Sequence, residues 1–281
     1  DTQALDEVVV VGYGTMKKRD LTGAITSVKS EDVVMNPSSN PMQALQGKVA
    51  GLDITRESGQ AGSGVKMQLR GNRSFQKDSG NPLFIIDGMP GDYSTLNPND
   101  IESIEVLKDA SSTAIYGSSG ANGVILITTK GGKEGKAIVN FNAYVGVNGW
   151  SRTPEMRSGE SYIQTLRDAS VGAGDGRWNS VADDKNLFTT DAEWNAHQNG
   201  QYIDWVDALL KTSVTQNYSV SVAGGTEKTK AYFSLNFSNE DGQFAQDSYK
   251  LYSSKIRVDH KIKKWMKVGI DAHLSYVHQN K

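Results

Sequence analysis

Residues 266–276 have the sequence MKVGIDAHLSY, in which apolar and polar side chains alternate. Side chains of a β-strand point alternately to its two faces, so this period predicts a strand with one apolar and one polar face. The stretches 139–147 and 231–238 follow the same period, and 214–223 and 249–259 follow it less cleanly. The C-terminal part of the chain is therefore predicted to form antiparallel strands that are each apolar on one side only.

Two architectures produce such strands, a soluble β-sandwich, which is the commoner, and a transmembrane β-barrel. Strand length favours the barrel, because the predicted strands of about 9–13 residues exceed the usual length of about 5–6 and match a tilted membrane-crossing strand. Their polar faces also suit the wall of a water-filled lumen, and we expect Lys267, Asp271 and His273 to face that lumen. The interpretation is that apolar faces meet lipid and polar faces meet water.

The connections between the predicted strands alternate in length, as they do in outer-membrane barrels. Residues 150–213 and Asn239–Asp247 are long connections, whereas Gly224-Gly225 and Lys261–Lys264 are tight turns. The first strand would then run outward, which makes 150–213 an extracellular loop. Five strands cannot close a barrel, and open edges in lipid leave backbone groups unsatisfied, so we expect the chain to be part of a longer barrel. Three aromatic residues are expected near strand ends at the membrane interfaces: Trp265, Tyr249 and Tyr276.

Residues 21–133 mix short apolar strands with short capped helices, which predicts a compact α+β domain. Strands are predicted at Leu83–Ile86 and Val124–Thr128, two short apolar runs bounded by turn residues. A helix is predicted from Asn40-Pro41 through Met42, Leu45 and Val49 to Gly51, because Asn is a favourable N-cap and Pro suits the first helical position. Two further expectations are a turn capped by Asp100 before Ile104–Leu107, and a helix over Ser111–Tyr116 that ends at Gly117.

Near the N-terminus, Val8–Val11 is a run of four β-branched residues that favours an extended backbone. It is followed by Gly12, Tyr13 and Gly14 and by the basic cluster Lys17-Lys18-Arg19, and no neighbouring strand is predicted to pair with it. The pattern fits two roles. The run is either an ordinary edge strand packed on the next domain or a strand that adds itself to the sheet edge of another protein.

The composition argues against several classes of function. The chain has 281 residues, no cysteine and a formal net charge of −2, so disulfide scaffolds, thiol nucleophiles, Cys-ligated zinc and a basic nucleic-acid surface are not expected. No nucleophile elbow, dinucleotide fingerprint or H-E-x-x-H motif is present, and we predict neither an enzyme nor a cofactor or metal site. Asp1-Thr2-Gln3 does not begin a signal peptide, so the sequence is expected to be a mature or trimmed form. The four scattered histidines are expected to be structural or solvated: His197, His260, His273 and His278.

Several blocks of sequence resemble one family in a fixed order. The first is "LDEVVVVGYG" at 5–14, continued by "KKRDLTGAITSV" at 17–28. The next are "LQGKVAGL" at 45–52, "LRG" at 69–71 and "PLFIIDGMP" at 82–90. The strongest is "DIESIEVLKDASSTAIYGSSGANGVILITTKGG" at 100–132, and "TQNYSVSVAGGTEKTKAYFSLNFSNEDG" begins at Thr215. Together they resemble the N-terminal portion of SusC/RagA-type TonB-linked outer-membrane transporters.

The resemblance implies an α+β plug domain followed by antiparallel transmembrane strands, which are the first strands of an incomplete 22-stranded barrel. Residues 1–20 would hold the TonB box and a linker, 21–133 the plug, and 134–281 the first barrel strands with the long extracellular loop. It implies a location in the bacterial outer membrane, with the TonB box in the periplasm and lipid around the barrel. It also implies active import of oligosaccharides, with oligopeptides as the second class, driven by the inner-membrane proton gradient. The implied partners are TonB with ExbB and ExbD and a SusD-like surface lipoprotein, and no nucleic acid.

Two sets of candidate site residues follow from the resemblance, and no catalytic residue is among them. The implied TonB box comprises Asp6, Glu7, Val8, Val9, Val10, Val11, Gly12 and Tyr13. The implied substrate-binding residues lie in two plug loops, whose amides, charged groups and one aromatic ring suit sugar hydroxyls and rings: Asn72, Arg73, Ser74, Gln76, Lys77, Asp78, Asp92 and Tyr93. The alternative from a different class is a soluble periplasmic or surface β-rich binding module without transport activity, for which these loops would be solvated surface.

Overall fold

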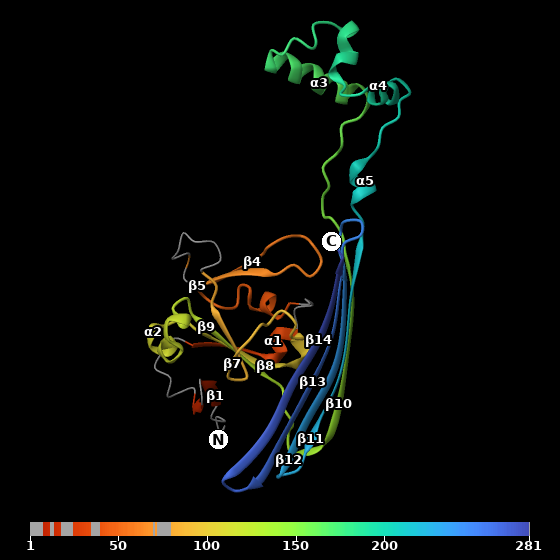
Figure 1. Ribbon diagram of the computed structural model, residues 1–281. Helices are drawn as coiled ribbons and strands as arrows, with labels where there is room; N and C mark the ends of the chain where they lie inside the picture. The colour runs from red at the N-terminus through yellow and green to blue at the C-terminus, as the bar shows by residue number, and fades with distance from the viewer. Residues whose placement is uncertain are drawn as a thin grey trace, which may run out of the picture. The chain divides into compact units, whose positions relative to one another are not determined.

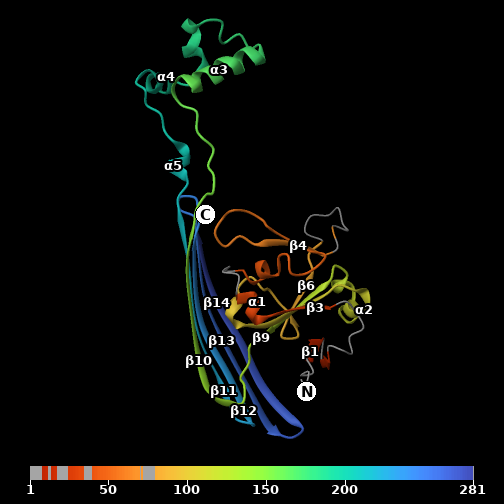
Figure 2. The same ribbon diagram turned by 180° about the vertical axis from the view of Figure 1, so that it is seen from behind.

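The computed structural model describes residues 8–11, 14–17, 25–34, 40–69, 71 and 80–280. The chain forms two compact units. The first comprises residues 1–148 and 213–281, and the second comprises Gly149–Thr212. Figures 1 and 2 show the elements of both units from opposite sides.

Five long strands form one continuous antiparallel sheet in the first unit. They are β10 (Gly135–Asn148), β11 (Ser213–Gly225), β12 (Thr229–Asp241), β13 (Ser248–Lys263) and β14 (Met266–Asn280), and they pair in chain order. Each has 13 to 16 residues, which is longer than predicted and long enough for a tilted strand to cross a bilayer. The sheet curves towards the face on which the rest of the unit lies (Figure 1).

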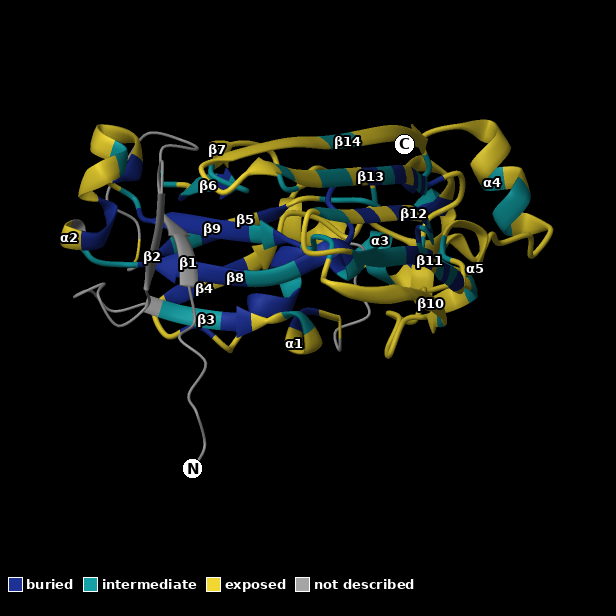
Figure 3. Cartoon of the chain, turned by 90° about the horizontal axis from the view of Figure 1, so that it is seen from below, coloured by how far each residue is buried: buried dark blue, intermediate teal, exposed yellow. Residues whose placement is uncertain are grey.

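The outward face of this sheet is apolar and its inward face is polar, which is the reverse of the arrangement in a soluble protein. Apolar side chains cover the outward face, where Phe141 is 69% and Ile270 70% exposed. Polar side chains on the inward face are buried, with Ser234 at 0% and Lys255 at 2% exposure. A soluble sandwich buries its apolar face, so the arrangement confirms barrel strands and contradicts the soluble alternative. Figure 3 shows the exposed edge strands β10 and β14 beside the buried strands β8 and β9 of the neighbouring domain.

Aromatic side chains mark two levels on the outward face. Tyr218, Phe237, Tyr252 and Tyr276 lie side by side across four strands, with ring centroids 6.3, 4.9 and 6.2 Å apart. Trp265 lies in the turn at the other end of β13 and β14 and is 78% exposed. At a rise of about 3.3 Å per residue and a tilt of about 40°, the two levels are about 25–30 Å apart, which is the height of the apolar band of an outer-membrane barrel.

Tyr249 does not belong to either level, and its predicted interfacial position is wrong. Its side chain lies on the inward face of β13, where it is buried with Ala61 and Leu251. The alternation of side chains along β13 explains this position. Leu251, Ser253 and Lys255 all face inward, and Tyr249 lies an even number of residues from them and so shares their face.

The plug domain is built on a second, five-stranded sheet. Its order is β3 (Ile25–Lys29), β8 (Ile101–Leu107), β9 (Val124–Thr129), β6 (Leu83–Ile86) and β7 (Met89–Pro90). Only the β6–β9 pair is parallel. A hairpin of β4 (Leu52–Arg56) and β5 (Val65–Leu69) and the short helix α1 (Ser30–Val34) complete it. The core is apolar and closely packed, and its largest fully buried members include Met42, Leu45, Ile101, Ile104, Ile125 and Ile127.

The predicted buried strands of the plug are present, but its helices differ from the prediction. Asn40 is the N-cap, accepting a hydrogen bond from the Met42 amide at 3.0 Å, yet the helix is a 3-10 segment that spans only Pro41–Leu45. The segment predicted as Ser111–Tyr116 divides into α2 (Ala110–Thr113) and η4 (Ala114–Gly120), with non-helical dihedral angles at Gly117. Helices as short as these are stabilised by packing on the core of the domain rather than by helix propensity.

Asp100 does not have its predicted capping role. The short 3-10 helix η3 (Pro98–Asp100) is capped by Asn97, whose side chain accepts a hydrogen bond from the Asn99 amide at 2.8 Å. The carboxylate of Asp100 is buried and is directed at the barrel strands instead.

The valine run near the N-terminus forms strand β1 (Val8–Val11). It pairs antiparallel with β2 (Gly14–Lys17), in the register Val8 opposite Lys17 and Val11 opposite Gly14. The expectation that this run has no ladder partner is therefore wrong. The partner strand begins three residues downstream, and it gives no strand signal in the sequence because Gly14–Lys17 carries no β-branched run of its own.

The second unit is helical, although the sequence indicated only a polar loop. It contains α3 (Gly159–Ala173), η5 (Val181–Leu187), α4 (Asp191–Gln198) and α5 (Trp205–Leu209). Arg167 and Asp184 form a bidentate ion pair at 2.9 and 2.6 Å, and this hydrogen bonding holds the pKa of Asp184 below its usual range. Phe188 packs against Trp194 with ring centroids 5.4 Å apart. In the parts of the chain that the structure describes, no helix combines the length and apolarity needed to span a membrane.

Candidate functional site: the plug against the barrel wall

The turn after β6 carries Asp87, which lies between the plug sheet and the barrel strands. Its backbone has φ of 48°, a left-handed conformation that Asp tolerates better than most residues. The carboxylate accepts hydrogen bonds from the Thr129 amide at 3.0 Å and from the Thr129 hydroxyl at 2.5 Å. The end of β9 therefore fixes the direction in which this carboxylate points.

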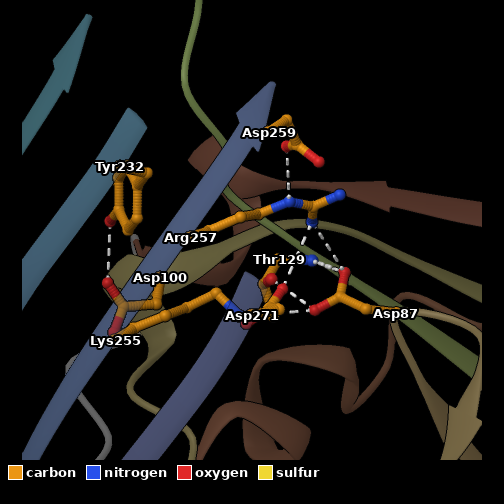
Figure 4. A network of polar contacts seen from close by, with 8 residues as sticks. All are labelled: Asp87, Asp100, Thr129, Tyr232, Lys255, Arg257, Asp259 and Asp271. Atoms are coloured by element: carbon orange, nitrogen blue, oxygen red, sulfur yellow. Dashed lines mark hydrogen bonds and ion pairs between the residues drawn. The ribbon is translucent and has the colours of Figure 1, made fainter. Parts of the chain in front are cut away.

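Two cations on the inward face of β13 approach this carboxylate (Figure 4). Lys255 Nζ lies 3.4 Å from Asp87 and 2.7 Å from Asp271 on β14. Arg257 lies 3.4 Å from Asp87, 3.6 Å from Asp271 and 3.2 Å from Asp259. We call these five residues and Thr129 the ionic cluster, and it joins the plug to two barrel strands.

The ionic cluster contains groups of both charges, and the side chain of Lys255 within it is almost completely buried. Burying a charge costs several kcal/mol unless a counter-charge compensates it, and here the carboxylates of Asp87 and Asp271 do so. One of these carboxylates comes from the plug and the other from the wall. The neutralisation of Lys255 therefore depends partly on the plug being in place.

A second polar contact lies beside the first. Asp100 of the plug accepts hydrogen bonds from the Tyr232 hydroxyl and from Asn236 Nδ2, each at 2.7 Å. Both donors lie on the inward face of β12, and all three side chains are buried. The main-chain oxygen of Asp100 accepts a hydrogen bond from the Lys130 amide at 2.7 Å. The polar face of the wall is thus bonded to plug carboxylates rather than to an apolar plug surface.

A polar cavity of about 830 Å³ separates the plug from the wall beside these contacts. Plug residues from β3, β8 and the end of β9 line one side, and wall residues from β10, β11 and β12 line the other. Its lining includes Lys29, Glu102, Lys130, Asn140, Ser221 and Tyr232. Burial lowers the pKa of Lys130, while Asp100 and Glu102 oppose that shift. The cavity therefore presents groups of both charges and neutral hydrogen-bonding groups.

Of the candidate substrate-binding residues, the structure describes Asp92 and Tyr93. Asp92 is exposed and accepts hydrogen bonds from the Ser94 amide at 2.9 Å and the Ser94 hydroxyl at 2.6 Å. Tyr93 packs on Phe84 with ring centroids 4.4 Å apart, and burial together with Asp92 raises its pKa to about 12. The phenol is therefore neutral at physiological pH. The other candidates lie outside the described residues: Asn72, Arg73, Ser74, Gln76, Lys77 and Asp78.

Among the implied TonB box residues, the structure describes the backbone of Val8–Val11 as β1. Asp6, Glu7, Gly12 and Tyr13 lie outside the described residues. Of the predicted lumen-facing residues, Asp271 joins the ionic cluster and His273 Nε2 lies 3.4 Å from Thr95 Oγ1 of the plug, whereas Lys267 is exposed. Within the described part of the chain, no group of three or more acidic or histidine side chains is placed to hold a metal ion.

The residues that join plug and wall carry no clear signal in the sequence. Asp87 lies within "PLFIIDGMP", but nothing in that block distinguishes it from a solvated turn residue. Lys255, Arg257 and Asp259 share one face of a strand whose alternation is weak, and a charged triplet at alternate positions was the available signal. Asp87, the plug partner of Lys255 and Arg257, is 168 or more residues away in the chain, so the pairing was not readable from local pattern.

A lipid-facing antiparallel sheet with an α+β domain bonded to its polar face defines the class of plugged β-barrel proteins. Residues 17–124 match the family model of the TonB-dependent receptor plug domain. The chain is 37% identical to TonB-dependent receptor P26 of Formosa agariphila over 98% of its own length and 27% of that protein. It is 33% identical to TonB-dependent receptor SusC of Bacteroides thetaiotaomicron over 92% of its length and 25% of that protein.

Solved structures give the same result. The RagAB peptide importer in its open-open state superposes with a TM-score of 0.82 at 32% identity, over 98% of this chain and 33% of that one. The chain belongs to the SusC/RagA-type TonB-dependent receptors, as the resemblance implied, and it spans about a quarter to a third of the length of these relatives. Proteins of this family are β-barrels of the bacterial outer membrane, and they are transporters rather than enzymes.

Proposed function

We propose that this chain forms the plug and first wall strands of a receptor that imports a polar oligomer across the outer membrane. The observation that carries the proposal is the ionic cluster, in which Asp87 of the plug is paired with the buried Lys255 and the partly exposed Arg257 of the wall. A permanently packed domain interface would use apolar contacts, whereas exchangeable polar contacts allow the plug to move and return. The plug then serves as the gate.

Movement of the plug would open a path along the wall. The polar cavity beside β10–β12 supports this, because it already separates plug from wall and its lining offers hydrogen bonds to a hydrophilic cargo. Asp92 and Tyr93 would contact the cargo first, the former as an acceptor and the latter as a neutral phenol and ring face. The same role is proposed for the plug-loop residues that lie outside the description.

Energy and partners complete the proposal. The outer membrane has no ion gradient, so TonB, acting with ExbB and ExbD, would pull on Asp6–Tyr13 from the periplasm. A SusD-like lipoprotein would close the outer side, where the helical unit Gly149–Thr212 belongs to the long connection between β10 and β11. The cargo class is oligosaccharide or oligopeptide, and the relative RagAB is described as a peptide importer.

Competitive depletion tests the proposal. Cells that express the full-length receptor and cells that lack it are given equal mixtures of oligosaccharides and oligopeptides, and the medium is followed by mass spectrometry. We expect one of the two classes to disappear at least tenfold faster in the presence of the receptor. Equal depletion of both mixtures by the two strains would contradict import of either class.

A further inference from the structure

The loop between β4 and β5 of the plug is fastened to the barrel wall by its own backbone. The amide of Ala61 donates a hydrogen bond to Asp247 Oδ2 at 2.9 Å. The carbonyl of Ala61 accepts one from Gln279 Nε2, also at 2.9 Å. Both main-chain groups of this buried residue are therefore bonded to side chains at one end of β13 and β14, instead of to water or to the plug.

Gly62 allows this approach. Its φ of +65° lies in the left-handed region, and a Cβ at this position would overlap the ring of Tyr249. Tyr249 and Leu251 of β13 are buried against Ala61. Only a residue without a side chain fits between the loop and the ring, so the sequence at position 62 is set by the wall rather than by the plug alone.

The connection between β12 and β13 completes this arrangement. Asp247 ends that connection, and its main-chain oxygen accepts a hydrogen bond from the Gly242 amide at 2.9 Å. Arg56, the last residue of β4, forms an ion pair with Glu240 near the end of β12 at 2.7 Å. Asp247 thus takes part in both contacts: its main-chain oxygen closes the connection over residues 242–247, and its carboxylate holds the plug loop. We call these contacts of Arg56, Ala61 and Gly62 with residues 240–251 and Gln279 the apical clasp.

We propose that the apical clasp couples the position of the plug to the conformation of the β12–β13 connection. The plug cannot leave this end of the wall without breaking the hydrogen bond from Ala61 to the Asp247 carboxylate. Loss of that bond frees the side chain of the residue whose main-chain oxygen closes the connection Gly242–Asp247. Gly62, Asp247 and Tyr249 are positioning residues in this scheme. The inference rests on the proposed function only in that plug movement is part of import.

The clasp is independent of the ionic cluster. It uses a different plug loop, and its contacts lie near Ser248 at one end of β13, whereas Lys255 and Arg257 lie in the middle of that strand. Coupling between two groups is reciprocal, so a change in the plug loop must alter the barrel connection and a change in the connection must alter the plug loop to the same extent.

Hydrogen exchange of the cargo-free full-length receptor in lipid nanodiscs tests the coupling in both directions. Gly62→Ala should accelerate amide exchange over residues 242–247 at least tenfold. Asp247→Ala should accelerate exchange of the Ala61 amide by a similar factor. Gly59→Ala is the matched control in the same loop, because a Cβ there meets no atom within 4 Å, and exchange should stay within twofold of wild type.

Two conservative variants separate positioning from general damage. Asp247→Asn retains an oxygen acceptor for the Ala61 amide, and Tyr249→Phe retains the ring, so both should behave like wild type. If Gly62→Ala leaves exchange over 242–247 equal to that of Gly59→Ala, the coupling does not exist. Neither cargo nor TonB enters the experiment, so this outcome would leave import itself untouched, just as a failed depletion experiment would leave the clasp untouched.

Discussion

Deletion of residues 6–13 from the full-length receptor is expected to reduce uptake at least 100-fold while the affinity for cargo stays unchanged. The segment is proposed to be the point at which TonB pulls, and without it no work reaches the plug. The proposed cargo contacts lie in plug loops and not in this segment, so a binding titration with purified receptor should give the wild-type Kd. Uptake by cells is measured as accumulation of labelled cargo over time.

A single substitution refines this expectation. A captured strand is held by main-chain hydrogen bonds, and Val9 lies within β1, where it is opposite Met16 of β2. Val9→Pro removes an amide donor and disfavours strand pairing, whereas Val9→Ala keeps the backbone intact. Val9→Pro should therefore reproduce most of the deletion phenotype and Val9→Ala should retain most of the uptake. Normal uptake by the deletion variant would refute the role of this segment.

Substitution of Lys255 by Met is expected to weaken the attachment of the plug to the barrel wall. Lys255 is 2% exposed, and loss of its ammonium group leaves Asp87 and Asp271 facing each other with Arg257 as the cation that still contacts both. Removing one member of a buried ion pair costs about 3–5 kcal/mol. This corresponds to an increase of at least 100-fold in the equilibrium constant for local opening of the plug. Amide exchange in β6 and β9 of the full-length receptor should accelerate by this factor.

Two further variants make that measurement specific. Lys263→Met is the matched control, since Lys263 lies on the same strand but is exposed and contacts only the Trp265 ring, at 5.7 Å, among the interactions described for it. It should change exchange by less than twofold. The double variant Lys255→Met, Asp271→Asn removes a carboxylate along with its cation and should recover part of the loss. Wild-type exchange in Lys255→Met would show that the ionic cluster does not hold the plug.

The faces of the long strands were readable from the sequence because a period of two has a direct geometric meaning. Residues 266–276 predicted which side chains of β14 face outward, and Ile270 and Leu274 are indeed exposed there. The same rule misplaced Tyr249, because the weak alternation of 249–259 hid the parity of β13. Strand parity is a local property, so it can be predicted wherever the alternation is clear.

The contacts between plug and wall were not readable in this way. Asp87 and Lys255 become neighbours only when the two sheets are placed against each other, and neither position carries a local signal of that pairing. The helical unit was missed for another reason. The helices other than α3 are short, and α4 has no buried residue, so no clear apolar period indicated this unit. The capping box of Ser180 and Asp183 and the N-cap Thr190 were the signals available.

The central claim is that the outward face of β10–β14 contacts lipid, and Ile270 tests it most directly. Ile270 is 70% exposed and lies about midway between the levels of Trp265 and Tyr276, which places it near the bilayer midplane. Val181 in the helical unit is exposed to the same degree, at 68%, but faces water in this account. The measurement is the free energy of unfolding of the full-length receptor in phospholipid vesicles for Ile270→Lys and Val181→Lys. The account predicts a loss of about 2–4 kcal/mol for Ile270→Lys and less than about 0.5 kcal/mol for Val181→Lys. Equally small losses for both variants would contradict it.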